Sequence, residues 1–150
     1  MVDILIKYVH ILSFMVVFTV LFMEMIFVKS QSAVSDLVRV RRYQNILLLF
    51  LGFTLLSGLI KLVTMGEHAA IYMKNGVFHL KVTLFLLITI LTFIPYRFFR
   101  NISAEPAGAG SPQEVPVPRS VRLIVHIQMI LLVLLPLLGV MMVRGIGYFG

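Results

Sequence analysis

The chain of 150 residues contains no cysteine. That absence excludes disulfides, thiol nucleophiles and thiolate-held metal or iron–sulfur sites. Charged residues are also scarce, at 13%, whereas 60% of the residues are apolar and the mean hydropathy is +1.04. Soluble domains carry about 25% charged residues. The composition therefore excludes an ordinary soluble enzyme and predicts an integral membrane protein that is surrounded by the lipid bilayer.

Basic residues exceed acidic ones, and the formal net charge is +7. A nucleic-acid-binding surface would place these charges in a stripe with interleaved aromatic residues. Here they stand at the ends of apolar runs instead. The charge pattern indicates anchoring at a membrane surface and no nucleic-acid partner.

Four apolar stretches are each long enough to cross a hydrocarbon core of about 30 Å. They cover residues 4–28, 46–63, 77–96 and 121–143. None alternates in polarity as a barrel strand would. We therefore predict an all-α membrane protein, an up-down four-helix transmembrane bundle, with residues 1–150 as a single domain. The first stretch is too long for a signal peptide and lacks a small-residue cleavage site, so we expect it in the mature protein.

Eight of the thirteen basic residues lie in the segments that join the first span to the second and the third to the fourth. They are Lys29, Arg39, Arg41, Arg42, Arg97, Arg100, Arg119 and Arg122. By the positive-inside rule these segments face the cytoplasm and both termini face outward, in a bacterial inner membrane. Residues 101–118 are rich in Pro, Gly, Ala and Ser, which predicts a flexible cytoplasmic linker.

Ionisable groups within a span are costly, so each one is a candidate functional residue. His10 lies roughly 9 Å below the outer surface and His79 roughly 3 Å below it, at a rise of about 1.5 Å per residue. The two coordinating nitrogens on one haem are about 4 Å apart, and the usual helix tilt of about 20° can absorb this mismatch. We therefore predict that His10 and His79 ligate the iron of haem b, with Lys7 and Lys81 near its propionates. The alternatives are plain hydrogen-bonded histidines and lysines that reach the headgroups.

A second group of polar residues lies nearer the cytoplasmic side. His126 is about 7–8 Å deep from that surface, roughly 13 Å along the membrane normal from His10, so the two cannot share an iron. Glu24 matches the depth of His126, and Gln128 is close in sequence. These three residues form a predicted secondary polar cluster. Its candidate roles are a structural hydrogen-bond network, a quinone site, a proton relay or a second cofactor site.

Short motifs in the first three spans resemble those of HemJ-type membrane protoporphyrinogen oxidases. The run Lys7-Tyr8-Val9-His10-Ile11 resembles the K-x-x-H-I entry to that family's first span, and Arg41-Arg42 and His79-Leu80-Lys81 resemble its paired arginines and H-x-K element. The resemblance implies that His10 is a haem ligand, and that Arg41, Arg42, His79 and Lys81 contact cofactor or substrate. The fourth span departs, because Val125-His126-Ile127-Gln128 stands where that family has an Asn-Glu-Val-Pro-like element.

The chain is more similar to a family of uncharacterised bacterial four-helix membrane proteins. That pattern is carried by Glu24, Gly66-Glu67, Tyr72, Asn75, Phe78-His79-Leu80-Lys81 and Pro95. The resemblance implies the fold and no activity.

Two functional hypotheses of different classes follow. The first is a haem-b-binding membrane protein with a redox or electron-transfer role, extending to an oxidoreductase of the protoporphyrinogen oxidase type. Its partner would be a quinone, a porphyrinogen or another membrane redox protein. The second is a cofactor-free accessory subunit of a larger membrane complex, whose polar residues make interhelical contacts. A proton or ion pathway through His10, Glu24 and His126 is a weaker third, and the sequence leaves open a homo-oligomer.

Overall fold

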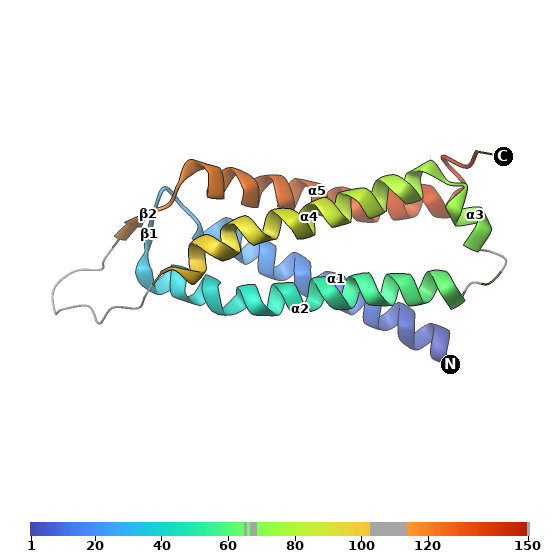
Figure 1. Cartoon of the computed structure of the whole chain (residues 1–150), viewed down its shortest axis with the longest axis horizontal. Helices are drawn as coiled ribbons and strands as arrows, with labels where there is room; N and C mark the ends of the chain where they lie inside the picture. Colours follow the sequence, from blue (N-terminus) through green and yellow to red (C-terminus); the bar gives the residue numbers. More distant parts are fainter. Residues whose placement is uncertain (65, 67–68, 103–113, 150) are drawn as a thin grey trace.

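The chain forms a bundle of four long helices that run up and down along one axis (Figure 1). The structure is a computed structural model that describes residues 1–64, 66, 69–102 and 114–149. The long helices are α1 (Val2–Phe27), α2 (Val34–Thr64), α4 (Gly76–Arg100) and α5 (Arg119–Val143). Each is long and apolar enough to cross a membrane. The predicted all-α transmembrane bundle is confirmed.

The helices are packed in two antiparallel hairpins. Helix α1 packs mainly on α2, and α4 packs mainly on α5, while α1–α5 and α2–α4 contacts close the ring. Helices α1 and α4 are therefore diagonal across the bundle. Both termini lie at one end, together with the short helix α3 (Ala69–Met73), and we call this the terminal end (Figure 1). The other end carries the arginines of the predicted cytoplasmic segments, and we call it the basic end.

Helix α2 begins twelve residues before the apolar stretch that predicts it, at Val34 rather than at Ile46. Its buried residues continue the same helical spacing through both parts: Leu37, Val40, Gln44, Leu47, Leu51, Thr54 and Ser57. Asp36 in the first turn also favours a helix start there, because a carboxylate interacts well with the helix dipole. Arg41 and Arg42 consequently stand on a helix and not in a loop.

At its C-terminal end, the segment expected to be a linker forms a strand. Residues 114–116 form strand β2 (Glu114–Pro116), which pairs antiparallel with β1 (Gln31–Ala33). Val117, directly after β2, is almost fully buried. This apolar anchor explains why the linker prediction for residues 101–118 is wrong at its C-terminal end. Residues 103–113 lie outside the described part of the chain.

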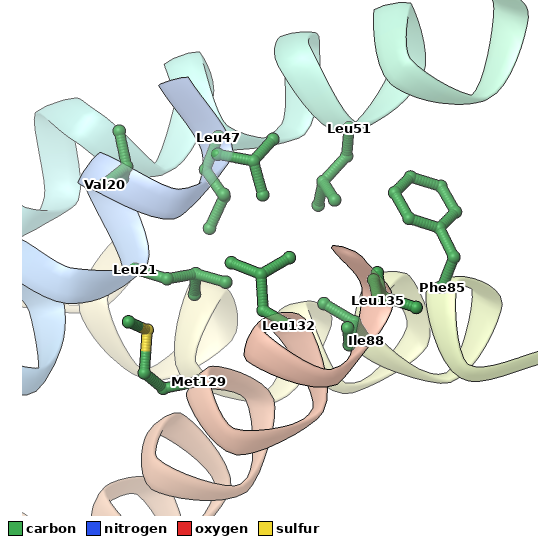
Figure 2. Close-up of a cluster of buried hydrophobic side chains, with 10 residues drawn as sticks. Val20, Leu21, Leu47, Leu51, Phe85, Ile88, Met129, Leu132 and Leu135 are labelled. Atoms are coloured by element: carbon green, nitrogen blue, oxygen red, sulfur yellow. The ribbon is translucent and has the colours of Figure 1, made fainter. Parts of the chain in front are cut away.

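Two apolar clusters hold the helices together. The central cluster joins all four long helices, with Leu21, Leu47, Ile88 and Leu132 completely or almost completely buried (Figure 2). The second cluster lies at the basic end, and its members are Val28, Leu37, Val40, Phe99, Val117 and Val121. We call it the basic-end core. Four of its members lie outside the predicted apolar stretches, and Val28 and Val121 stand at the ends of two of them.

At the terminal end of the bundle, Asn75 connects the start of α4 to the segment that follows α5. Its side chain accepts hydrogen bonds from the backbone N–H groups of Val77 (2.9 Å) and Phe78 (3.3 Å), which caps α4. The same side chain donates to the carbonyl of Ile146 (3.2 Å), near Gly147, whose φ of +83° turns the chain back. The cap thus ties the start of α4 to the segment that follows α5.

Replacing Asn75 by alanine is expected to lower the free energy of unfolding by about 1–2 kcal/mol, because the cap and its buried partners are lost. The measurement is denaturant unfolding of the purified protein in detergent, followed by circular dichroism. Asn101→Ala at the opposite end of α4 is the matched control, since Asn101 is exposed. We expect a change within about 0.5 kcal/mol for that control. Equal losses for both variants would contradict the role of the cap.

Candidate functional site

A cavity of about 510 Å³ opens between the helices at the terminal end. Small-molecule and cofactor sites have volumes of about 300–1,000 Å³. All four long helices and α3 contribute to its lining, which is mostly apolar. The polar or titratable lining residues are His10, Thr54, Lys61, Tyr72 and Lys81. The cavity is therefore an apolar chamber with a few basic groups, and we call it the terminal cavity.

His10 on α1 is held in one orientation by α2. Its Nδ1 lies 3.1 Å from the carbonyl oxygen of Thr54 and 2.9 Å from Oγ of Ser57. A carbonyl can only accept, so Nδ1 donates and Nε2 carries the lone pair; this tautomer is assigned from the hydrogen-bond partners. Nε2 has no hydrogen-bond partner among the described residues. A histidine whose Nδ1–H binds a backbone carbonyl while Nε2 stays available is in the usual arrangement of a metal ligand.

Small residues make room for two of the basic side chains of the terminal cavity, His10 and Lys81. A Cβ atom on Gly58 would lie 3.4 Å from Cε1 of His10, so the glycine lets the imidazole lie against α2. A Cβ atom on Gly139 would lie 3.2 Å from Nζ of Lys81. Small residues at helix interfaces permit such close approach. The glycines are thus part of how the bundle accommodates polar side chains in its apolar interior.

Lys61 and Lys81 both line the terminal cavity. Among the described residues, the single ion pair joins Lys7 to Asp3 at 2.6 Å, so neither lysine of the cavity is paired with a described carboxylate. Two ammonium groups that share one apolar chamber favour a ligand that brings negative charge. The terminal cavity is therefore suited to an apolar molecule that carries anionic groups.

The structure does not bring His79 to His10. Nε2 of His79 lies 2.8 Å from the carbonyl oxygen of Met73, and the ring is exposed in the first turn of α4. The reason is local, because α3 ends at Met73 and places its carbonyl above the start of α4. Lys7 is likewise engaged elsewhere, in an exposed ion pair with Asp3. Of the residues predicted for the haem site, His10 and Lys81 line the terminal cavity.

The secondary polar cluster divides into separate contacts. Glu24 accepts a hydrogen bond of 2.6 Å from Nε2 of Gln44, which joins α1 to α2. Gln128 donates to Oγ1 of Thr92 (2.7 Å) and joins α5 to α4. His126 is exposed, and its Nδ1 lies 2.7 Å from the carbonyl of Arg122 on its own helix. Glu24 and His126, which match in depth, make no contact with each other among the described hydrogen bonds, because His126 is exposed while Glu24 is buried.

Arg41 and Arg42 lie at the basic end, at the opposite end of α2 from the terminal cavity. They line a second hollow of about 450 Å³, and Arg41 also donates to the carbonyl of Ile102 at 2.9 Å. The candidate cofactor residues thus separate into two sites at opposite ends of the bundle.

Sequence reasoning missed several residues of the terminal cavity. Ser57 and Thr54 orient His10. In the sequence they are small, weakly polar residues that indicate no particular function. Met142 of α5 and Tyr72 of α3 also line the cavity. One signal was available, because Thr54, Gly58 and Lys61 recur at i, i+4 and i+7, on one face of a helix.

The fold and the terminal cavity define a class: a four-helix integral membrane protein with a ligand-sized chamber near one surface. The chain belongs to the family described as Predicted membrane protein (DUF2214), whose model matches residues 2–147. This confirms the expected membership in an uncharacterised family of membrane proteins. No curated protein and no solved structure matches the chain. The likeness to HemJ-type oxidases stays a resemblance of short motifs.

Proposed function

We propose that the protein is a haem-b-binding membrane protein with a redox role, and that the terminal cavity is the haem site. The observation that carries the proposal is the state of His10: Nδ1 is engaged by Thr54 and Ser57, and Nε2 is available at the wall of a ligand-sized cavity. A neutral imidazole oriented in this way is suited to bind haem iron.

The remaining lining residues fit the other parts of the same group. The apolar walls suit a porphyrin ring, and the ammonium groups of Lys61 and Lys81 suit its two carboxylates. Met142 lines the same cavity, and a methionine thioether is a known axial ligand of haem. His10 would hold the iron, and Met142 would be the candidate second ligand in place of His79.

The proposed role is a transfer of single electrons within a bacterial inner membrane, with the terminal end on the outer side. When bound, haem supplies a one-electron ferric–ferrous couple. The chain itself orients His10, keeps water out with its apolar lining and neutralises the carboxylates with two lysines. The proposed electron partner is a quinone, a porphyrinogen or another membrane redox protein.

The deciding measurement is a reduced-minus-oxidised absorption spectrum of the protein purified in detergent from cells with ample haem supply. We expect the α and Soret difference bands of a b-type haem, at close to one haem per chain by the pyridine haemochrome assay. A protein that is folded by circular dichroism and still shows no haem under these conditions contradicts the proposal. Copurification of stoichiometric partner subunits without a chromophore would favour the accessory-subunit hypothesis instead.

A further inference from the structure

A groove at the basic end is lined mainly by charged and polar side chains, whereas the terminal cavity is mostly apolar. Its volume is about 450 Å³, and it lies between α2 and α4. Three arginines line it, Arg41 and Arg42 from α2 and Arg100 from α4, together with the polar side chains of Asn45 and Tyr96. We call this the basic groove. The proposed haem function makes no use of it.

We propose that the basic groove binds the phosphate group of an anionic phospholipid. Guanidinium groups bind phosphate through paired hydrogen bonds, and basic pockets between transmembrane helices bind lipid headgroups. Within the described residues, none of the three arginines forms an ion pair with a carboxylate. The amide of Asn45 and the hydroxyl of Tyr96 add neutral donors to the same groove. The fold thus gathers three positive charges that are not paired with any carboxylate of the described residues.

The floor of the basic groove is fixed, which makes it a preformed site. Gln44 lines the groove and is only 1% exposed, and its Nε2 is bonded to Glu24 of α1. Phe99, also in the lining, is fully buried in the basic-end core. Arg41 is positioned by its hydrogen bond to the carbonyl of Ile102. The arginines therefore project from a packed and hydrogen-bonded base.

The position of the basic groove along the helices favours a lipid over a soluble phosphate. Ile46 and Leu49 follow Arg42 on one face of α2, and both are exposed apolar residues. On α4, exposed Phe93 precedes Tyr96 and Arg100 at helical spacing. Each arginine-bearing face thus continues into an apolar face, as a phospholipid does from phosphate to acyl chains. By the positive-inside rule the lipid belongs to the cytoplasmic leaflet.

The test compares lipids and variants on the full-length protein after delipidation in a neutral detergent. Native mass spectrometry would count bound dioleoyl-phosphatidylglycerol and dioleoyl-phosphatidylcholine at equal concentrations. We expect wild-type protein to bind phosphatidylglycerol at least about tenfold more tightly, since each arginine near an anionic headgroup contributes about a fivefold effect. Equal binding of the two lipids by wild-type protein overturns the proposal without the need for any variant.

A charge-matched pair of double variants then locates the site. Arg42→Gln with Arg100→Gln removes two arginines of the basic groove and is expected to weaken phosphatidylglycerol binding at least about tenfold. Arg39→Gln with Arg97→Gln removes two exposed arginines from the same helices at the same end, outside the groove lining, and is expected to leave binding within about twofold. Equal weakening by both pairs overturns the site and indicates unspecific charge attraction.

A third arm identifies the source of the phosphate. Inorganic phosphate is added at roughly 10 times the lipid concentration. It lacks the acyl chains that would contact α2 and α4, so we expect it to displace little phosphatidylglycerol and to act only as an ion that screens charge. Full displacement of phosphatidylglycerol from the wild-type protein overturns the lipid assignment and indicates a soluble phosphate as ligand.

Discussion

His10→Ala is expected to weaken haem binding at least about 100-fold, so that the variant is purified without the b-type difference bands. Mutation of a residue that merely orients a histidine ligand lowers metal affinity about 10–100-fold, and loss of the ligand itself lowers the affinity further. Among the described residues, His10 is the one histidine in the lining of the terminal cavity, and its replacement leaves the apolar walls in place. The measurement is haem titration of the purified apoprotein, followed at the Soret band.

Two histidine variants serve as matched controls for His10→Ala. His79→Ala and His126→Ala each remove an exposed imidazole whose described hydrogen bond goes to a nearby backbone carbonyl. We expect both variants to retain the wild-type difference spectrum. A spectrum lost in His79→Ala and kept in His10→Ala would contradict the site proposed here and favour an iron bound at the start of α4.

Phe99→Ala is expected to be the most destabilising single substitution outside the terminal cavity, with a loss of about 3–5 kcal/mol in the free energy of unfolding. Phe99 is 0% exposed and packs in the basic-end core with Leu37, Val40 and Val117. Phe99 lies beyond the end of the predicted apolar stretch 77–96, and the burial of its aromatic ring contributes a large hydrophobic effect. The measurement is denaturant unfolding in detergent, followed by circular dichroism.

Phe93→Ala is the control for Phe99→Ala on the same helix. Phe93 is 49% exposed and faces the surface that lipid would cover. Its ring has much the same apolar surroundings whether the helices are packed or apart, so we expect a change within about 0.5 kcal/mol. If the two variants lost similar stability, the basic-end core would not be a distinct source of stability.

The transmembrane helices could be predicted from the sequence because lipid permits few alternatives. A long apolar stretch in a bilayer must satisfy its backbone hydrogen bonds internally, so length and hydropathy suffice for α4 and α5. The start of α2 could not be predicted in this way. Residues 34–45 include Asp36, Arg39, Arg41 and Arg42, so their mean hydropathy hides the helical repeat that buries Leu37 and Val40.

The candidate site was predicted in part. Depth along the helix axis placed His10 and Lys81 toward the same end of the bundle, and both line the terminal cavity. Depth says nothing about which way a side chain points around the axis. His79 therefore could not be separated from His10 by sequence, although α3 engages one ring and α2 engages the other. Lys61 and Met142 line the terminal cavity because helices that are distant in sequence pack against each other.

The sequence by itself determined that this protein is a four-helix membrane bundle, because apolar length and the need for internal backbone hydrogen bonds leave little else in lipid. It also determined that one end is basic. Only the tertiary structure decided that Glu24 bonds to Gln44, that His10 lines a cavity with Lys61 and Lys81, and that three arginines gather in one groove. The reason is that helix rotation and pairing depend on side chains from several segments at once, and no single segment encodes them.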